Sequence, residues 1–274
     1  METVEFSKMS GSGNDFIVID NRDAAVSEAS SVDFVRRVCR RRLSVGADGV
    51  IFLEPSETVD FRWRFYNADG SLAEMCGNGA RCAARFAYLN RIAGKQLAFE
   101  TLAGTISAQV IDRRVRLKMT APSPLKCGLS LVLAEKTYTV CHVDTGVPHA
   151  VLLVDDVNQA DVIGIGRKIR YHDAFAPGGT NVNFVALNSD GTLAIRTYER
   201  GVEDETLACG TGAVAAALVA AVKAGRTSPV QVRPLGGGTL NVHFAREGES
   251  FTSVYLEGDA RVIYKGRLAP EALE

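Results

Sequence analysis

The feature that most constrains the fold of this chain is an internal repeat centred on two cysteines. The segments CGNGARCAA and CGTGAVAAA, which begin at Cys76 and Cys209, align without a gap. The register continues downstream, because Leu102 and Leu235 lie the same distance beyond their cysteines and each precedes a glycine-containing turn. Similarity at a fixed offset is the signature of a duplicated structural unit. We therefore predict that the chain contains two copies of one unit.

Each copy is predicted to be β-structure around one helix. Short segments with alternating or β-branched residues, separated by turn residues, are typical of strands in antiparallel sheets. These segments are residues 60–67, 98–101, 105–111, 114–119, 136–143, 149–154, 181–187, 192–199, 230–234, 239–244 and 252–258. The prediction is an α+β fold with two pseudo-symmetric domains, each a strongly curved, mainly antiparallel β-sheet wrapped around a central helix.

Three segments have the apolar spacing of helices. Residues 32–43 carry three consecutive arginines near their end, which suits the negative end of the helix dipole. The helix from Gly79 to about Ala93 contains arginines, including Arg81, and is expected to show one face to solvent and to end at Gly94. Residues 212–225 contain a single charge, so this helix should be buried nearly all round, and it is too short to span a membrane.

The best candidate for a linker is Thr120–Gly128, where two prolines, a serine and a glycine interrupt the β pattern. The second repeat is complete by about Gly258, so the last strand is expected to return to the first domain. We therefore predict an N-terminal domain of residues 1–119 plus 262–274 and a C-terminal domain of residues 120–261. Each domain would carry one of the repeated cysteines, and the active site would lie in the cleft between them.

Composition argues against several classes of function. The chain has 274 residues, 46% of them hydrophobic, which supports a large buried core. Lys and Arg number 31 against 32 Asp and Glu, so no net field would attract nucleic acid or an anionic membrane. The expected partner is a small molecule. No apolar run approaches the roughly 20 residues of a membrane span, and neither end has a signal-peptide pattern, so we expect a cytoplasmic protein.

The six cysteines and four histidines do not have the spacing of a disulfide framework or of a metal site. We therefore expect reduced thiols and no metal. Four cysteines have no recurring sequence context and are interpreted as structural: Cys39, Cys82, Cys127 and Cys141. No lysine has a recognisable pyridoxal-phosphate context, which predicts chemistry without a cofactor.

A cysteine at a helix N-terminus combines an acid or base with an anion site. The N–H groups of the first turn and the helix dipole lower the pKa of such a thiol and attract a carboxylate. Neighbouring glycines let the backbone approach a ligand closely. Two such sites could hold one carboxylate between both helix ends, with a sulfur on each side of the adjacent carbon. This pattern favours inversion of a stereocentre by proton transfer, with one cysteine as thiolate and the other as thiol.

A competing interpretation is that Cys76 and Cys209 are small core residues at two helix starts, as reduced cysteine often is. The register-matched repeat favours the catalytic interpretation.

Two other segments resemble nucleotide loops only superficially. The segment GSGND lacks the third glycine of the dinucleotide fingerprint and precedes a predicted strand, and GIGRK fails as a phosphate loop for similar reasons.

Taken together, the motifs of the chain resemble those of the diaminopimelate epimerase family. They are GSGNDFIVID, GADGVIF, FYNADGS, MCGNGARC, GVPHAV, GTNVNFV and YERGVEDETLACGTGA, in order over essentially the whole chain. The resemblance implies a pyridoxal-phosphate-independent isomerase that interconverts LL- and meso-diaminopimelate in lysine and peptidoglycan biosynthesis. It also implies two similar α/β domains that close around the substrate, and usually a homodimer. Tyr264, in the C-terminal strand, is an expected dimer contact.

The resemblance assigns roles to residues of this sequence. Cys209 would be the base toward the LL substrate and Cys76 the acid, with the roles exchanged in reverse. Main-chain N–H groups for the reacting carboxylate would come from Gly77, Asn78, Gly210 and Thr211. The reacting ammonium and the distal carboxylate would be held by Asn67, Glu199 and Arg200. The distal stereocentre would be read by Asn14 and Asn181, and the thiol pair would be tuned by His149 and Glu199.

Alternatives to these assignments stay open. Asn67 could merely shape the turn that follows it, and His149 could be a loop histidine. Val147 and Gly49 stand where some members of the family have asparagine and glutamine, near the distal end of the substrate. A related racemase of another amino acid, such as histidine, is therefore a second hypothesis. A non-catalytic carboxylate-binding or thiol-redox module is a third.

Overall fold

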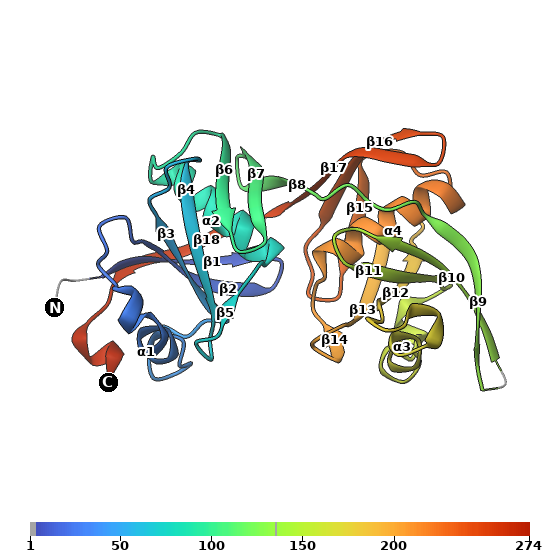
Figure 1. Ribbon diagram of the computed structural model, residues 1–274, viewed down its shortest axis with the longest axis horizontal. Helices are drawn as coiled ribbons and strands as arrows, with labels where there is room; N and C mark the ends of the chain where they lie inside the picture. The colour runs from blue at the N-terminus through green and yellow to red at the C-terminus, as the bar shows by residue number, and fades with distance from the viewer. Residues whose placement is uncertain (1–3, 135) are drawn as a thin grey trace. The chain divides into compact units, whose positions relative to one another are not determined.

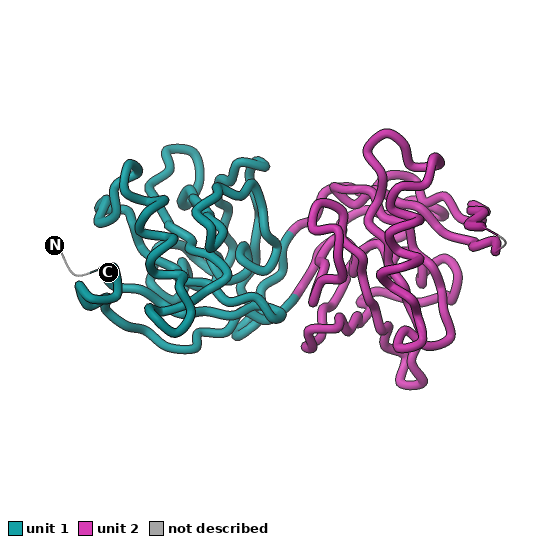
Figure 2. Tube along the Cα trace, turned by 90° about the horizontal axis from the view of Figure 1, so that it is seen from below, with its two compact units in different colours: residues 1–117, 258–274 teal, residues 118–257 magenta. Residues whose placement is uncertain are grey.

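The computed structural model describes residues 4–134 and 136–274, which form two compact units. Unit 1 comprises residues 1–117 and 258–274, and unit 2 comprises residues 118–257 (Figure 2). The chain leaves unit 1 at the end of β8 (Arg114–Lys118) and returns to it within β17 (Ser250–Asp259). Unit 1 is therefore built from both parts of the chain that flank unit 2, and unit 2 is continuous.

The sheet of unit 1 has the strand order β18-β1-β2-β3-β4-β6-β7-β8 (Figure 1). Its neighbours are antiparallel except for the parallel pairs β2/β3 and β4/β6. The strands other than β8 are β1 (Glu5–Gly11), β2 (Asn14–Asp20), β3 (Gly49–Glu54), β4 (Phe61–Asn67), β6 (Gln96–Thr101), β7 (Gly104–Ile111) and β18 (Arg261–Arg267). A short strand, β5 (Leu72–Ala73), pairs with β4.

The sheet of unit 2 repeats this plan strand by strand. Its order is β9-β10-β11-β12-β13-β15-β16-β17, with parallel pairs at β11/β12 and β13/β15. The strands other than β17 are β9 (Lys126–Leu133), β10 (Lys136–Asp144), β11 (Pro148–Leu153), β12 (Asn181–Leu187), β13 (Leu193–Glu199), β15 (Val230–Pro234) and β16 (Leu240–Glu247), and the short β14 (Asp204–Thr206) pairs with β13. The first strand differs in origin, because unit 1 takes it from β18 near the end of the chain and unit 2 takes it from β9.

One helix lies inside each curved sheet. In unit 1, α2 (Gly77–Leu89) packs on the neighbouring strands β1, β2 and β3 and also on β7, which lies beyond β4 and β6 in the strand order, so the sheet must bend around it. In unit 2, α4 (Gly210–Lys223) packs in the same way on strands from β10 to β16. The remaining helices are α1 (Glu28–Val38) and α3 (Val162–Arg170), with short 3₁₀ turns η1 (Val157–Gln159), η2 (Asp173–Phe175) and η3 (Pro270–Leu273). The predicted fold class is confirmed.

Apolar residues on both faces of each sheet explain these layers. In β3, Val50 and Phe52 join the cluster that contains Val35 of α1, whereas Ile51 contacts α2 from the other face. Successive side chains of a strand point to opposite faces, so a strand covered on both sides has a continuous apolar sequence. The helix α4 is buried from Gly212 to Ala221, as its composition predicts. Within the two described ranges, no helix is long and apolar enough to cross a bilayer.

Several local predictions need correction. The helix α2 ends at Leu89 rather than near Gly94, and its Arg81 is fully buried instead of facing solvent. The guanidinium can be buried because it donates hydrogen bonds to acceptors of the loop, the helix and β17. The first helix begins and ends about four residues earlier than expected. The expected linker overlaps the start of β9, because its prolines stop at Pro124.

The expectation that all cysteines are reduced is wrong for one pair. Cys127 and Cys141 form a disulfide between β9 and β10. The antiparallel register places them directly opposite each other, with Cα atoms 4.0 Å apart. This proximity depends on strand pairing, which their sequence spacing alone does not reveal. Cys39 and Cys82 are buried, and burial raises the pKa of both thiols to about 12, as is typical of inert core cysteines.

Candidate active site

The first repeated cysteine, Cys76, is the N-cap residue of α2. Its backbone is extended (φ −146°, ψ 115°), and its Sγ accepts a hydrogen bond from the N–H of Gly79 at 3.5 Å. A Cβ added at Gly77 would meet no atom of the described chain within 4 Å, whereas one at Gly79 would lie 3.2 Å from Cδ1 of Ile51. The first glycine therefore leaves open space beside the helix start, and the second lets α2 pack closely on β3.

Two predicted substrate-binding residues of unit 1, Asn14 and Asn78, contact each other. Nδ2 of Asn78 donates to Oδ1 of Asn14 at 2.8 Å, and Nδ2 of Asn14 donates to the carboxylate of Asp48 at 3.0 Å. Asn14 follows a two-residue turn in which Ser12 and Gly13 both have positive φ, 47° and 98°. Such a turn fixes the register of the β1–β2 hairpin. The segment GSGND is thus a hairpin turn that places Asn14 beside the first turn of α2.

Asn67 and Gly49 lie opposite each other in the pairing of β3 with β4. Asn67 is exposed, and its Nδ2 donates to Oγ of Ser71 at 3.0 Å, across the turn that follows the strand. A Cβ added at Gly49 would lie 2.4 Å from the carbonyl oxygen of Tyr66 and 2.7 Å from the ring of Phe65. A larger residue at position 49 would require the backbone to move, so packing alone accounts for this glycine.

The second repeated cysteine, Cys209, is the N-cap residue of α4 and also has an extended backbone (φ −116°, ψ 111°). It is more deeply buried than Cys76, with 8% of its surface exposed. Burial raises the pKa of its thiol to about 12, and the negative charge of Glu199 acts in the same direction. The hydroxyl of Thr211, 3.5 Å from the sulfur, opposes this shift. Cys209 is therefore a neutral thiol near pH 7.

The glycines of α4 face closer neighbours than Gly77 does. A Cβ at Gly210 would lie 2.9 Å from Leu256, and one at Gly212 would lie 2.4 Å from Oδ1 of Asn183. Both glycines are therefore needed for close packing of the helix start on unit 2. The second of them brings the amide of Asn183 next to the cysteine end of α4.

The turn between β10 and β11 is tied to the start of α4. Oγ1 of Thr145 donates to the carbonyl oxygen of Thr211 at 3.1 Å. Val147 is half-buried in the same turn, and its carbonyl oxygen accepts from the N–H of Thr145 at 3.1 Å. The predicted substrate-proximal Val147 thus lies within three residues of a direct link to α4.

Asn181, the first residue of β12, bridges two segments of the main chain. Its Oδ1 accepts the N–H of Arg200 at 2.9 Å, and its Nδ2 donates to the carbonyl oxygen of Pro148 at 3.0 Å. Its side chain is buried. These bonds fix the main chain on both sides of the site, next to His149 and next to Glu199.

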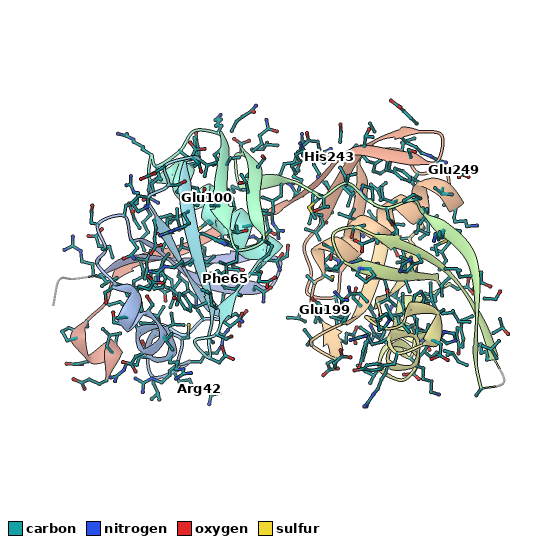
Figure 3. All side chains as sticks on the ribbon, viewed as in Figure 1. Arg42, Phe65, Glu100, Glu199, His243 and Glu249 are labelled. Atoms are coloured by element: carbon teal, nitrogen blue, oxygen red, sulfur yellow. A yellow bond between two sulfur atoms is a disulfide. The ribbon has the colours of Figure 1, made fainter. Side chains whose placement is uncertain are left out.

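Glu199 ends β13, where Figure 3 labels it. Its Oε2 accepts a hydrogen bond from Oγ1 of Thr206 at 2.7 Å. Burial raises the pKa of the Glu199 carboxyl, and the bond from Thr206 counteracts part of that effect. The guanidinium of the adjacent Arg200 donates to the carbonyl oxygen of Gly178 at 3.4 Å. The two predicted ligands of the substrate are therefore neighbours in sequence with separate partners.

His149 is completely buried, and its neighbours determine its tautomer. Nδ2 of Asn183 faces both the carbonyl oxygen of Ala150 and Nδ1 of His149, each at 3.1 Å, and Thr197 donates to Oδ1 of the same asparagine. A carbonyl oxygen can only accept, so the amide nitrogen must face it, and Nδ1 must also accept. The proton is therefore on Nε2, which has no hydrogen-bond partner among the residues that the structure describes. Burial lowers the pKa of His149 to about 3.

The two helix starts share one chemical capacity. Each presents a sulfur, the N–H groups of a first helical turn and the positive end of a helix dipole, which together stabilise a thiolate or a bound carboxylate. Their surroundings differ, because the sulfur of unit 2 lies near the carboxylate of Glu199, whereas the helix start of unit 1 lies beside a chain of amides. Each helix start by itself can therefore hold an anion beside a sulfur that donates or accepts a proton.

Comparison with known proteins identifies the family. Residues 6–124 and 141–263 match the family described as diaminopimelate epimerase. The chain belongs to the diaminopimelate epimerase family. A diaminopimelate epimerase of Aquifex aeolicus is 47% identical over 99% of this chain and 100% of its own length. One of Chlorobaculum tepidum is also 47% identical, over 95% of this chain and 99% of its own length.

Solved structures with low sequence identity share the fold of this diaminopimelate epimerase family member. A phenazine biosynthesis protein of the PhzF family from Bacillus anthracis superposes with a TM-score of 0.73 at 14% identity, over 98% of this chain and 100% of that one. A probable proline racemase from Agrobacterium radiobacter has a TM-score of 0.67 at 15% identity, over 98% and 95% of the two chains. These likenesses concern the fold alone.

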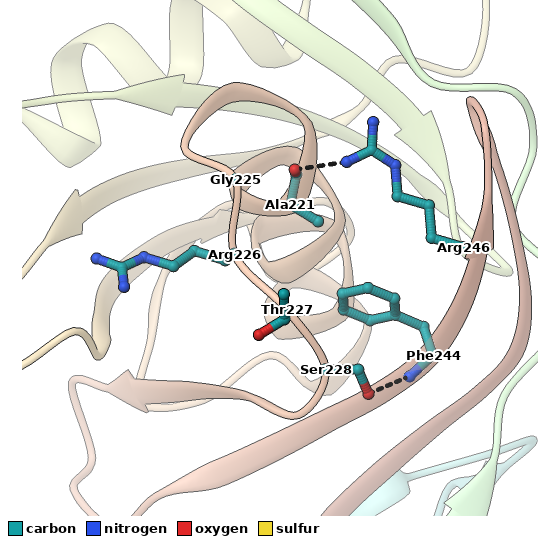
Figure 4. Close-up of a pocket in the computed structure, with 7 residues that line it drawn as sticks. All are labelled: Ala221, Gly225, Arg226, Thr227, Ser228, Phe244 and Arg246. Carbon is teal, nitrogen blue, oxygen red and sulfur yellow. Dashed lines mark hydrogen bonds between the residues drawn. The ribbon is translucent and has the colours of Figure 1, made fainter.

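A surface pocket at the other end of α4 is distinct from the helix start that carries the diaminopimelate epimerase motif. It has a volume of about 230 Å³ and is lined by residues that include Gly225, Phe244 and Arg246 (Figure 4). Arg246 donates to the carbonyl oxygen of Ala221 at 2.7 Å, near the end of the helix. A helix of 14 residues is roughly 21 Å long, so this pocket is remote from Cys209.

Sequence reasoning missed four polar residues of the two helix-start regions in this diaminopimelate epimerase family member. They are Asp48, Arg81, Asn183 and Thr206. Two signals could have found Arg81 and Asn183. The repeat aligns Arg81 with Val214, so one copy has a charge where the other is apolar. Asn183 interrupts an apolar strand segment, and a buried polar residue of this kind needs partners.

Proposed function

We propose that this chain epimerises LL-2,6-diaminopimelate to the meso isomer by proton transfer between the α-carbon and two thiols. The observation that carries the proposal is the cysteine N-cap at the start of both α2 and α4, in a member of the diaminopimelate epimerase family. Cys209 removes the proton from the LL substrate, and Cys76 returns one on the opposite face. In the reverse reaction the roles are exchanged.

The proposed reaction needs a strong electrostatic contribution, because an amino-acid α-proton is far less acidic than a thiol. We propose that the reacting carboxylate binds main-chain N–H groups at both helix starts, from residues 77, 78, 210 and 211. Preorganised N–H donors are a large source of transition-state stabilisation. The ammonium and the distal end are assigned to Asn67, Glu199 and Arg200, with Asn14 and Asn181 near the distal stereocentre. No cofactor takes part.

The protonation states fit one direction of the reaction directly. A neutral Cys209 thiol is the acid required for conversion of meso- to LL-diaminopimelate. Conversion of the LL isomer requires that this proton first leaves, and Glu199 opposes the resulting charge while Thr211 favours it. The neutral His149 can act as an Nε2–H donor, not as a base.

The test is uptake of solvent deuterium at the α-position of LL-diaminopimelate, measured by NMR with reduced protein. Wild type is expected to exchange, and Cys209→Ala is expected to lose at least about 10²-fold in exchange rate, the usual share of a general acid or base, because Cys209 removes the α-proton of the LL isomer. Cys76→Ala is expected to lose a similar factor in the rate of epimerisation, because Cys76 returns the proton on the opposite face. Cys39→Ala, at the end of α1, is the control that should retain exchange. Exchange that survives in Cys209→Ala, or epimerisation that survives in Cys76→Ala, would contradict two-thiol chemistry.

A substrate panel separates the alternatives. Diaminopimelate should be preferred over histidine and other amino acids by a large margin. Racemisation of histidine at a higher kcat/KM would favour the second hypothesis, and ligand binding without any exchange would favour the non-catalytic module. The packing of Gly49 weakens the case for altered specificity at that position.

The assembly and location are proposed from the family. We propose a cytoplasmic homodimer with Tyr264 at the interface. Tyr264 is 44% exposed and packs edge-on against Phe6, with ring centroids 5.9 Å apart. Light scattering of wild type and Tyr264→Ala tests this assignment, since the substitution should shift a dimer toward monomer. A monomeric wild type would reject it.

A further inference from the structure

The most deeply buried charge of unit 1 lies one turn after the start of α2. Arg81 has no exposed surface. Its Nη2 donates to Oγ of Ser12 at 2.7 Å and to Oδ1 of Asn78 at 2.8 Å, and its Nε donates to the carbonyl oxygen of Asp259 at 3.1 Å. Burying a guanidinium among mostly neutral acceptors costs free energy, and this desolvation lowers its pKa. An apolar residue of similar size would pack at lower cost.

From Arg81, hydrogen bonds continue through two amides to a carboxylate. Arg81 donates to Asn78, Asn78 donates to Asn14 at 2.8 Å, and Asn14 donates to Oδ2 of Asp48 at 3.0 Å. We call this chain of four residues the amide relay. One end is a guanidinium, which can only donate, and the other is a carboxylate, which can only accept. Both ends therefore impose the same orientation on both amides, so neither amide can rotate by half a turn without losing bonds.

The second repeat shows that this relay is not required for the fold. The gapless alignment pairs Arg81 with Val214 and Asn78 with Thr211. The helix α4 begins at an equivalent cysteine N-cap and packs inside an equivalent sheet with an apolar residue at that position. The guanidinium thus serves something that distinguishes the first helix start from the second.

We propose that Arg81 and Asp48 are positioning residues that fix the side chain of Asn14 for substrate recognition. This inference rests on the proposed function, in which Asn14 contacts the substrate. After its relay bonds, the Asn14 amide retains one N–H and one lone pair, both held in defined directions. Such preorganisation lowers the cost of ordering the site when the substrate binds. If the Asn14 amide rotated by half a turn, its free N–H and its free lone pair would exchange places. Each would then face a substrate group that needs the other.

Kinetics of substitutions at both ends test the relay. Arg81→Gln is expected to raise KM for LL-diaminopimelate about tenfold or more, and Asp48→Asn about threefold or more, with kcat changed less, since a hydrogen bond to a charged group is typically worth such a factor. Arg81→Lys keeps a donor-only cation and should lie closer to wild type than Arg81→Gln. Arg85→Gln is the matched control, because Arg85 lies one turn further along α2 and donates to the carbonyl oxygens of Asp112 and Ala260.

Coupling between the ends distinguishes a relay from two local defects. The double variant Arg81→Gln/Asp48→Asn should raise KM by less than the product of the two single effects, because either substitution alone already releases Asn14. Multiplicative effects, or an unchanged KM in both single variants, would overturn the proposal. Asp48 is partly exposed, so Asp48→Asn is expected to fold. This variant tests the relay even where Arg81→Gln folds poorly.

A second readout is independent of turnover. In protein labelled with [¹⁵N]asparagine, the side-chain amide signals of Asn14 and Asn78 should both shift in Asp48→Asn and in Arg81→Gln, and stay unchanged in Arg85→Gln. The relay is wrong if a substitution at one end leaves the amide nearest the other end unaffected. If the amide signals shift as expected but the wild-type protein has no exchange activity, the relay stands and the proposed function is rejected.

Discussion

Hydrogen bonds among buried side chains determine the protonation of His149. The carbonyl oxygen of Ala150 orients Asn183, and Asn183 then requires Nδ1 of the imidazole to accept. Burial lowers the pKa of this histidine to about 3, so the folded state binds a proton there only at low pH. The unfolded state binds one near pH 6.5, the ordinary histidine value.

This difference predicts a pH dependence of stability. Between pH 6.5 and 3 the unfolded chain carries a proton that the folded His149 does not, so the free energy of unfolding should fall as the pH falls, by at most about 1.4 kcal/mol per pH unit from this residue. Denaturant unfolding of wild type and His149→Gln from pH 7 to pH 5 checks it. The variant should show a shallower decline, and parallel curves would contradict the assignment.

At the scale of single elements, the two helix starts differ in how tightly their glycines are packed. Gly212→Ala would place a Cβ 2.4 Å from Oδ1 of Asn183, whereas Gly77→Ala meets open space. We expect Gly212→Ala to lower the free energy of unfolding by about 1–3 kcal/mol, as overpacking does, and Gly77→Ala to change it by less than about 0.5 kcal/mol. Urea unfolding of both variants measures this contrast, and equal stabilities would show that α4 can shift.

The disulfide between β9 and β10 predicts a redox-dependent stability for this hairpin. Its cysteines are 14 residues apart, and the chain-entropy estimate for a loop of this length is about 3 kcal/mol. Reduction of Cys127–Cys141 should therefore lower the midpoint of thermal unfolding. Calorimetry with and without a phosphine reductant tests this, and the double variant Cys127→Ala/Cys141→Ala should lose the response to reductant. An unchanged midpoint of thermal unfolding of the wild type in the presence of reductant would contradict the prediction.

At the scale of the whole molecule, unit 1 depends on a strand from the far end of the chain. The strand β18 pairs along β1 from Glu5 to Ser10. Removal of residues 261–274 would leave the backbone groups of β1 without these partners, take Leu268 out of the core and uncover Phe6. Unit 2 has its own core around α4 and its own complete sheet.

Truncation after residue 260 should therefore unfold one unit selectively. Hydrogen exchange read by mass spectrometry should show loss of protection in β1, β2 and α1 and retained protection in β10 to β13. Peptides of α4 serve as the internal reference, because that helix is buried within unit 2. Loss of protection in both units together would show that they do not fold separately.

The sequence by itself determined the duplicated plan, the fold class and the two cysteine helix starts. These depend on periodicity, on short motifs and on an offset repeat, all of which are written along the chain. The position of Cys76 and Cys209 as N-caps follows from glycine spacing and from the apolar helices behind them.

Only the tertiary structure decided which distant side chains meet. The burial of Arg81, the partner of Cys127 and the tautomer of His149 depend on strand register and on contacts between segments far apart in sequence. A local pattern specifies which face of an element is apolar, but it does not specify which element covers that face. For that reason the solvent exposure expected for Arg81 was wrong, and the amide relay could not be read from the residues alone.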